Sequence, residues 1–331
     1  MKHLLGSCIG NGLIPHQARE AFKSKAEKYN YVGLVFDCFT PNTCQQAVQS
    51  NEEQSSLDLR LYQFIANYFF FLISVDDRID ASTEYDKRNH LLDDFINVMH
   101  QLQFSISDVE DKSDPHVRFM VQLMKELHGL TSNQSVINRF IKHMEDFYNI
   151  GIRNSEQSTK ETPEQYLERR LFDSATYAML PIVELTSTEN AIGLSIEEYE
   201  SQKLLFATVE RSCNIVLSLV NDLLSYHKDV LLPSLTSSTI DLPNLSYLQV
   251  LLKNNSGMSL MEATTICLEE IQKHQHAVNN QVETNQHLLN KKQVQYLRGI
   301  KEFMDGMSTW MCFSNRYRNK DSPFEELCHE I

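Results

Sequence analysis

Apolar residues recur every three or four positions along most of the chain, which is the spacing of one face of an α-helix. Only 10 glycines and 8 prolines interrupt this pattern. Two polar stretches, SEQSTKETP and LLPSLTSSTIDLP, are predicted to be loops, and the second could close over a pocket. The chain is therefore predicted to be all-α, with helices near 16–29, 54–80, 84–103, 114–128, 134–152, 163–181, 196–229, 244–254, 258–284 and 287–315.

Length and charge narrow the class of protein. The 331 residues contain no linker or change of composition, so we expect one domain over 1–331 that is large enough to enclose a pocket. The formal net charge is −14, and the chain has no basic patch of the kind that a nucleic-acid backbone requires. A nucleic acid is therefore not an expected partner, and a polyanionic ligand would need cations beside it.

Cysteine usage and hydropathy indicate the compartment. Seven cysteines are scattered without a CxxC pair, which favours a reducing compartment and argues against zinc. The apolar part of MKHLLGSCIG is too short for a secretory signal, and the run FFFLISV is far shorter than the roughly 18 residues of a membrane span. We expect a cytoplasmic protein without stable membrane insertion. The sequence is compatible with a homodimer and does not fix the oligomeric state.

The stretch VNDLLSYHKDV (220–230) places three oxygen-bearing side chains four residues apart, on Asn221, Ser225 and Asp229. On a helix these residues span roughly 80° and about 12 Å, and therefore share one face. An amide oxygen, a hydroxyl and a carboxylate form a hard ligand set suited to Mg²⁺ that is shared with phosphate and water. A solvated helix end is the alternative for this triplet taken alone.

A second acidic cluster ends the apolar run FFFLISVDDRID (69–80). Asp76, Asp77 and Asp80 lie at the predicted C-terminus of a helix, where carboxylates oppose the helix dipole at a cost of about 0.3–1 kcal/mol each. Divalent cations would compensate for that charge, although a solvated helix end again explains the cluster taken alone. If the two helices run side by side, the two clusters face each other.

These residues resemble the motifs of class I terpene synthases, in particular the single-domain microbial type. DDRID resembles the aspartate-rich motif, and NDLLSYHKD resembles the second metal motif, except that Asp229 stands where the family usually has Glu. In YLERRLFDSA, three residues resemble the diphosphate-sensing arginine, the linker and the effector, namely Arg170, Asp173 and Ser174. In WMCFSNRYRN, the pair Arg316 and Tyr317 resembles the C-terminal Arg-Tyr motif, preceded by Trp310. The resemblance spans roughly residues 15–320.

The resemblance implies an α-helical class I terpenoid synthase fold around a central apolar cavity, with three Mg²⁺ ions at its mouth or Mn²⁺ in their place. The implied metal ligands are Asp76, Asn221, Ser225 and Asp229, together with Asp77 and Asp80, which either ligate metal or anchor the closed state through basic groups. The implied diphosphate ligands are Arg170, Lys228, Arg316 and Tyr317, and the implied catalytic residues are Arg170, Asp173, Ser174 and Trp310. Trp310, Phe313 and Tyr317 are predicted to share one helical face that could stabilise a cation.

The expected function is the ionisation of a linear prenyl diphosphate and the cyclisation of the resulting allylic cation, with release of diphosphate. Farnesyl diphosphate is the expected substrate and a sesquiterpene the product, while geranylgeranyl and geranyl diphosphates are alternatives. A prenyl diphosphate synthase would normally carry a second aspartate-rich cluster where this chain has Asn221 and Ser225. A non-catalytic helical adaptor would leave the aligned ligands and arginines unexplained.

Overall fold

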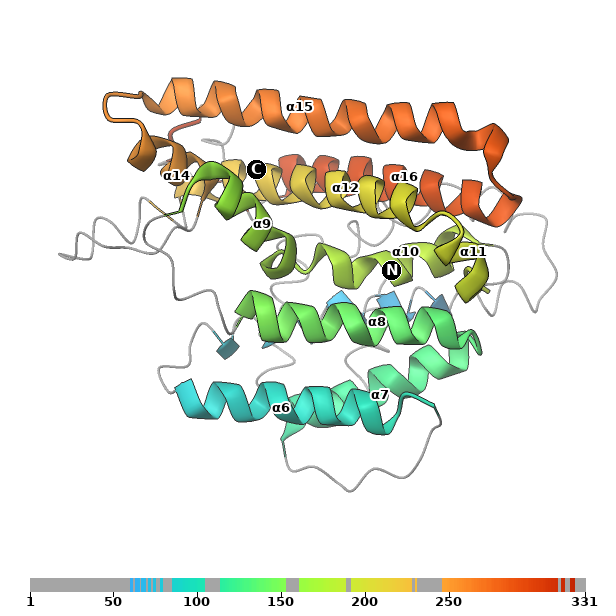
Figure 1. The fold of residues 1–331 in the computed structure, drawn as a ribbon. Helices are drawn as coiled ribbons and strands as arrows, with labels where there is room; N and C mark the ends of the chain where they lie inside the picture. The colour runs from blue at the N-terminus through green and yellow to red at the C-terminus, as the bar shows by residue number, and fades with distance from the viewer. Residues whose placement is uncertain are drawn as a thin grey trace.

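The computed structural model is a bundle of helices, and no strand occurs in its described residues. α15 lies along one side, α12 and α16 lie next to it, α9 and α10 form the middle, and α8 separates them from α6 and α7 (Figure 1). The all-α prediction is confirmed. The structure describes residues 60–61, 63–65, 67–69, 71–72, 74–75, 78–79, 85–104, 114–152, 161–188, 192–227, 230, 246–314, 317–318 and 322–324.

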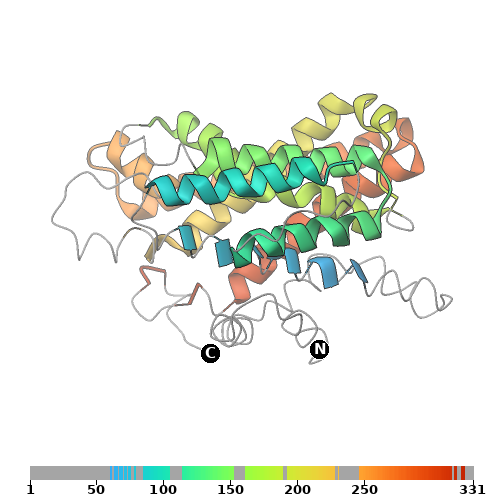
Figure 2. The ribbon, with the colours of Figure 1, turned by 90° about the horizontal axis from the view of Figure 1, so that it is seen from below.

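The first half of the bundle follows the predicted helices closely. The described residues between 60 and 79 are helical, whereas the helix predicted near 16–29 lies outside the described part. Seen from below, α6 and α7 lie side by side, and the helical pieces of 60–79 run along α7 (Figure 2). The bounds are α6 Tyr85–Gln101, α7 Pro115–Leu130, α8 Gln134–Asp146, and a π-helical segment η1 at Phe147–Ile152.

The second half departs from the prediction at two places. The helix predicted over 163–181 is broken into two, and the helix predicted over 196–229 is a short helix followed by a long one that ends at Leu224. The bounds are α9 Pro163–Asp173, α10 Thr176–Ser187, α11 Ile196–Glu200, α12 Lys203–Leu224, α14 Tyr247–Asn254, α15 Leu260–Asn285, a 3₁₀ turn η5 Gln286–Leu288, and α16 Lys291–Phe313.

Several helices begin where a short polar side chain accepts from the backbone of the first turn. The Asp114 carboxylate accepts from the amides of His116 and Val117 at the start of α7, and Pro115 occupies the first helical position. α9 begins with a capping box between Thr162 and Gln165. The same reciprocal arrangement begins α11, α15 and α16.

The break between α9 and α10 lies at Ser174 and Ala175. Ser174 caps α9, and Ala175 has a φ of 58°, a left-handed conformation that is rare for residues other than glycine. A continuous helix through this point would carry residues 163–181 in one direction, as the apolar spacing predicts. The break redirects the chain and leaves backbone groups there without helical partners.

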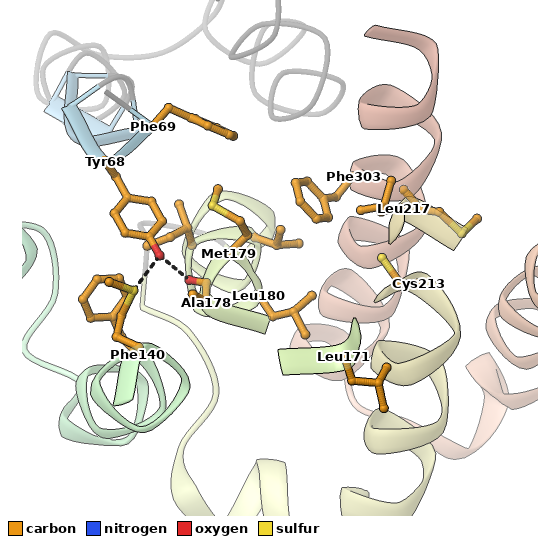
Figure 3. Close-up of a cluster of buried hydrophobic side chains, with 14 of the residues drawn as sticks. Tyr68, Phe69, Phe140, Leu171, Ala178, Met179, Leu180, Cys213, Leu217 and Phe303 are labelled. Carbon is orange, nitrogen blue, oxygen red and sulfur yellow. Dashed lines mark hydrogen bonds between the residues drawn. The ribbon is translucent and has the colours of Figure 1, made fainter. Parts of the chain in front are cut away.

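A buried apolar cluster lies where the described helical residues between 60 and 79 meet α8, α9, α10, α12 and α16 (Figure 3). The Tyr68 hydroxyl lies 3.0 Å from Met144 Sδ and 3.2 Å from the Ala178 carbonyl oxygen, which ties three helices together. α12 is the one described helix long and apolar enough to cross a membrane, but most of its apolar stretch is buried inside the protein. Its apolar character is therefore explained by its central position in the core.

Gly151 allows η1 to pack directly on the backbone at the end of α9. A Cβ atom at this position would lie 2.5 Å from the Phe172 carbonyl oxygen and 2.9 Å from Asp173 Cα, closer than real Cβ atoms approach. We therefore expect Gly151→Ala to lower the free energy of unfolding by about 1–3 kcal/mol, because backbone must move to admit the methyl group. Urea-induced unfolding followed by circular dichroism measures this change.

Gly129→Ala is the matched control, since Gly129 lies in α7 and a Cβ atom there would meet no neighbouring atom within 4 Å. Alanine there should stabilise the protein by about 0.5–1 kcal/mol through its higher helix propensity. If both variants unfolded at the urea midpoint of the wild type, the close approach of η1 to α9 would be wrong.

Candidate active site

Arg170 is the centre of a polar cluster on the last turn of α9. Its Nη1 donates to Asp173 Oδ1 at 2.7 Å, and its Nη2 donates to Asn221 Oδ1 at 3.1 Å. On the other edge of the guanidinium, Nε donates to Asp222 Oδ1 at 3.1 Å. Residues that are about 50 positions apart in sequence thus meet because α9 packs against α12.

The C-terminal segment reaches the same cluster through Tyr317. Asn221 Nδ2 donates to the Tyr317 hydroxyl at 3.0 Å, so the two ends of one amide bind Arg170 and Tyr317. The Tyr317 ring meets the Trp310 ring edge to face, with 6.0 Å between the ring centroids. Both rings are buried. Three of the four sequence motifs therefore converge on one group of contacts.

Asn221 and Ser225 lie at the C-terminal end of α12. Asn221 is in the last turn, and Ser225 is the residue that caps the helix, with its amide donating to the Asn221 carbonyl at 2.8 Å. The regular helix α12 therefore ends before the predicted end at 229, although Tyr226, His227 and Val230 are again helical. A helix C-terminus carries partial negative charge, which favours a bound cation. Oxygen donors at this place fit a hard divalent ion such as Mg²⁺ better than zinc or copper.

Asp173 is shared by two arginines. It accepts from Arg170 at 2.7 Å and from Arg169 at 2.5 Å, and Arg169 also forms an ion pair with Glu161 at 2.7 Å. Burial disfavours the charged form of Arg170, but Asp173 and Asp222 outweigh burial and raise the pKa of its guanidinium above the ordinary value. Arg170 is therefore a fixed positive charge at any working pH.

The break that contains Ser174 is held by a buried asparagine of α12. The Ser174 hydroxyl donates to Asn214 Oδ1 at 2.9 Å, and Asn214 Nδ2 donates to the Leu171 carbonyl at 2.8 Å. Ser218 adds a third contact by donating to Asn214 Oδ1 at 3.1 Å. The conformation of the α9–α10 junction is thus set by side chains far away in the sequence.

Three of these buried polar residues were not predicted from the sequence, namely Asn214, Ser218 and Asp222. They follow each other at four-residue intervals along an otherwise apolar part of α12, which places them on one face. A polar stripe inside a buried helix requires hydrogen-bond partners, and that requirement was the available signal. Ser218 binds Asn214 within α12, whereas the other partners lie on α9, at its end and at the start of α14, and could not be read from spacing.

Six predicted site residues lie outside the described part of the chain, so their placement stays a prediction; they are Asp76, Asp77, Asp80, Lys228, Asp229 and Arg316. The predicted face of Trp310, Phe313 and Tyr317 is wrong. α16 ends at Phe313, which is 70% exposed, whereas Trp310 and Tyr317 are buried. Only Trp310 and Tyr317 contact each other.

The fold is similar to solved structures of known enzymes. A variant of the SVS_A2 protein from ancestral sequence reconstruction superposes with a TM-score of 0.67 at 14% identity, covering 100% of this chain and 88% of that one. Hedycaryol synthase in complex with HEPES gives a TM-score of 0.66 at 16% identity, covering 93% and 91%. The complex of hedycaryol synthase with nerolidol gives a TM-score of 0.65 at 15% identity, covering 93% of this chain and 92% of that one. These similarities define a class I terpene synthase fold.

Residues 67–276 match the family described as terpene synthase family 2, C-terminal metal binding. Because the match covers more than half of the chain, this protein belongs to that family and is a terpene synthase. A divalent metal follows from the metal-binding character of the matched domain. No curated protein sequence matches the chain significantly.

Proposed function

We propose that this protein is a Mg²⁺-dependent sesquiterpene synthase. It ionises farnesyl diphosphate by breaking the bond between the allylic carbon and oxygen, so that diphosphate leaves with the electron pair. The allylic cation then cyclises and loses a proton or captures water to give an apolar product. The geometry that supports this most directly is the set of contacts that joins Arg170, Asn221 and Tyr317 from three separate segments.

The leaving group carries about three negative charges, which must be met by fixed donors and cations before it can depart. Bound Mg²⁺ would neutralise part of this charge. Asn221 and Ser225 would supply oxygen ligands from α12, and the planar fork of Arg170 would bind phosphate oxygens in a bidentate manner. Tyr317 would add a hydroxyl donor. Asp76, Asp77, Asp80, Lys228, Asp229 and Arg316 complete the proposed set.

The hydrocarbon chain requires an apolar region next to the polar cluster. Leu217 lies four residues before Asn221 on α12, and Phe303 lies seven before Trp310 on α16, which is about 6 and 10 Å along each helix. Phe69 lies seven residues before Asp76 in sequence. These side chains belong to the buried apolar cluster (Figure 3). A buried apolar cluster on the helices that carry the charged residues supports carbocation chemistry, since water would quench the cation.

The choice of farnesyl diphosphate rests on the length of the chain and on the likeness to hedycaryol synthase, a sesquiterpene synthase. We expect purified protein with Mg²⁺ or Mn²⁺ to convert farnesyl diphosphate to a volatile hydrocarbon or alcohol, and EDTA to abolish this turnover. Gas chromatography with mass spectrometry after incubation with geranyl, farnesyl or geranylgeranyl diphosphate measures the result. Parallel assays should include isopentenyl diphosphate, because a longer prenyl diphosphate formed from it would indicate prenyl transfer.

Folded protein that forms no product from any of the three substrates would contradict the proposal, as would turnover that survives EDTA. Product from geranylgeranyl diphosphate alone would keep the class of reaction and replace the sesquiterpene assignment with a diterpene one.

A further inference from the structure

Asp222 is the most deeply buried carboxylate next to the candidate site, with 1% of its surface exposed. One oxygen, Oδ1, binds Arg170 through Nε at 3.1 Å and Nη2 at 3.0 Å. The other, Oδ2, accepts from the Tyr166 hydroxyl at 2.6 Å and from the Tyr247 amide at 3.0 Å. This carboxylate therefore joins the arginine of α9 to the first residue of α14.

The contacts of Arg170 divide between the two edges of its guanidinium. The edge formed by Nε and Nη2 lies on Asp222, whereas the outer nitrogens Nη1 and Nη2 reach Asp173 and Asn221. A guanidinium can bind a phosphate group with two nitrogens on one side while a carboxylate holds the other side. The outer edge is the side that faces Asn221, a proposed metal ligand, and it is therefore the side available to a diphosphate.

The partners of Arg170 differ in how easily they can release it. Asp173 keeps Arg169 as a second cation, and Asn221 keeps Tyr317 as a hydrogen-bond partner. In the described part of the chain, Asp222 has no cation other than Arg170. If Asp222 released Arg170, this buried carboxylate would have no cation beside it or would have to take up a proton. That costs far more free energy than the release of Arg170 by Asp173 or Asn221.

We propose that Asp222 is the positioning residue for Arg170: it holds the Nε edge while the outer edge exchanges Asp173 and Asn221 for the diphosphate of the substrate. This inference rests on the proposed function, because it requires a diphosphate ligand. The exchange would also release the Asn221 oxygen, which accepts from Arg170 Nη2 at 3.1 Å. Because Asp222 fixes the orientation of the guanidinium through Nε and Nη2, Arg170 needs little conformational search to meet the leaving group.

A double-mutant cycle tests this role, with calorimetry measuring the affinity for inorganic diphosphate in the presence of Mg²⁺. Asp222→Asn should weaken diphosphate binding about tenfold in the wild-type background, because the arginine loses its charged anchor. In an Arg170→Gln background, the same substitution should change the affinity by less than about twofold, since Asp222 would then have nothing to position. A tenfold loss in both backgrounds would overturn the inference.

Glu210→Gln is the matched control for loss of a buried carboxylate. Glu210 lies on the same helix, is 4% exposed, and binds two tyrosine hydroxyls, those of Tyr199 and Tyr296, but does not contact Arg170. The Glu210→Gln substitution should lower the melting temperature without changing the affinity for diphosphate.

If the Arg170→Gln variants do not fold, the melting temperatures of Asp222→Asn and Glu210→Gln test the positioning role instead. A positioning role makes the rise in melting temperature on adding Mg²⁺ and diphosphate smaller in Asp222→Asn than in Glu210→Gln. Equal rises would overturn the inference. If wild-type protein neither binds diphosphate nor turns over a prenyl diphosphate, the proposed function itself fails; if it does both and the cycle is additive, only the role of Asp222 fails.

Discussion

Replacing Arg170 with lysine should lower kcat for farnesyl diphosphate by a factor on the order of 100 or more, while the protein stays folded. Each hydrogen bond from a charged donor to the departing group contributes about 1.5–3 kcal/mol, and lysine cannot reproduce the two parallel contacts of a planar fork. Lysine keeps the positive charge beside Asp173 and Asp222, so neither carboxylate is left without a cation. Steady-state kinetics together with a circular dichroism melt separate catalysis from stability.

Arg211→Lys is the control for this substitution. Arg211 is an exposed arginine of α12 that pairs with Glu168 at the surface, where an ion pair contributes about 0–1 kcal/mol. The Arg211→Lys substitution should leave kcat unchanged. A kcat for Arg170→Lys equal to that of wild type would remove Arg170 from the diphosphate site.

The helices could be predicted from the sequence because apolar periodicity over long segments records which face is buried. α6, α7, α8, α15 and α16 lie close to the expected ranges, and capping residues such as Asp114 and Thr162 mark where helices begin. The break at Ser174 and Ala175 was missed, because neither residue is a glycine or a proline. Its conformation depends on Asn214, a tertiary contact that no local pattern encodes.

The candidate site shows the same division between local and tertiary information. Asn221 and Ser225 stand at a helix end with suitable oxygen atoms, as their spacing indicates, and Arg170 reaches Asn221. The pairing of Arg170 with Asp222 could not be predicted, since it depends on how α9 packs against α12. The aromatic face that included Phe313 failed because α16 ends there, and periodicity alone does not locate the last residue of a helix.

Asp229 is the position where the sequence departs from related terpene synthases, and its role can be tested directly. With the helical spacing that the sequence predicts for 221–229, side chains lean toward the N-terminus of the helix, and the last ligand of the triplet would have to reach back toward the metal. Aspartate in place of glutamate shortens this reach by roughly 1.3 Å, a large fraction of the roughly 2.1 Å length of a Mg–O contact. The wild-type protein should therefore require more Mg²⁺ than a glutamate variant.

We expect Asp229→Ala to abolish turnover, because Asn221 and Ser225 are neutral and the triplet would lose its only carboxylate. Asp229→Glu should retain turnover and reach half its maximal rate at a lower Mg²⁺ concentration. If Asp229 were only a solvated residue, alanine would change stability by no more than about 0.5 kcal/mol and leave the rate unaffected. Rates measured against Mg²⁺ concentration for the wild type and both variants distinguish the two cases. An alanine curve that superimposes on the wild-type curve would exclude Asp229 from the metal site and leave Asn221 and Ser225 without a charged ligand beside them in this motif.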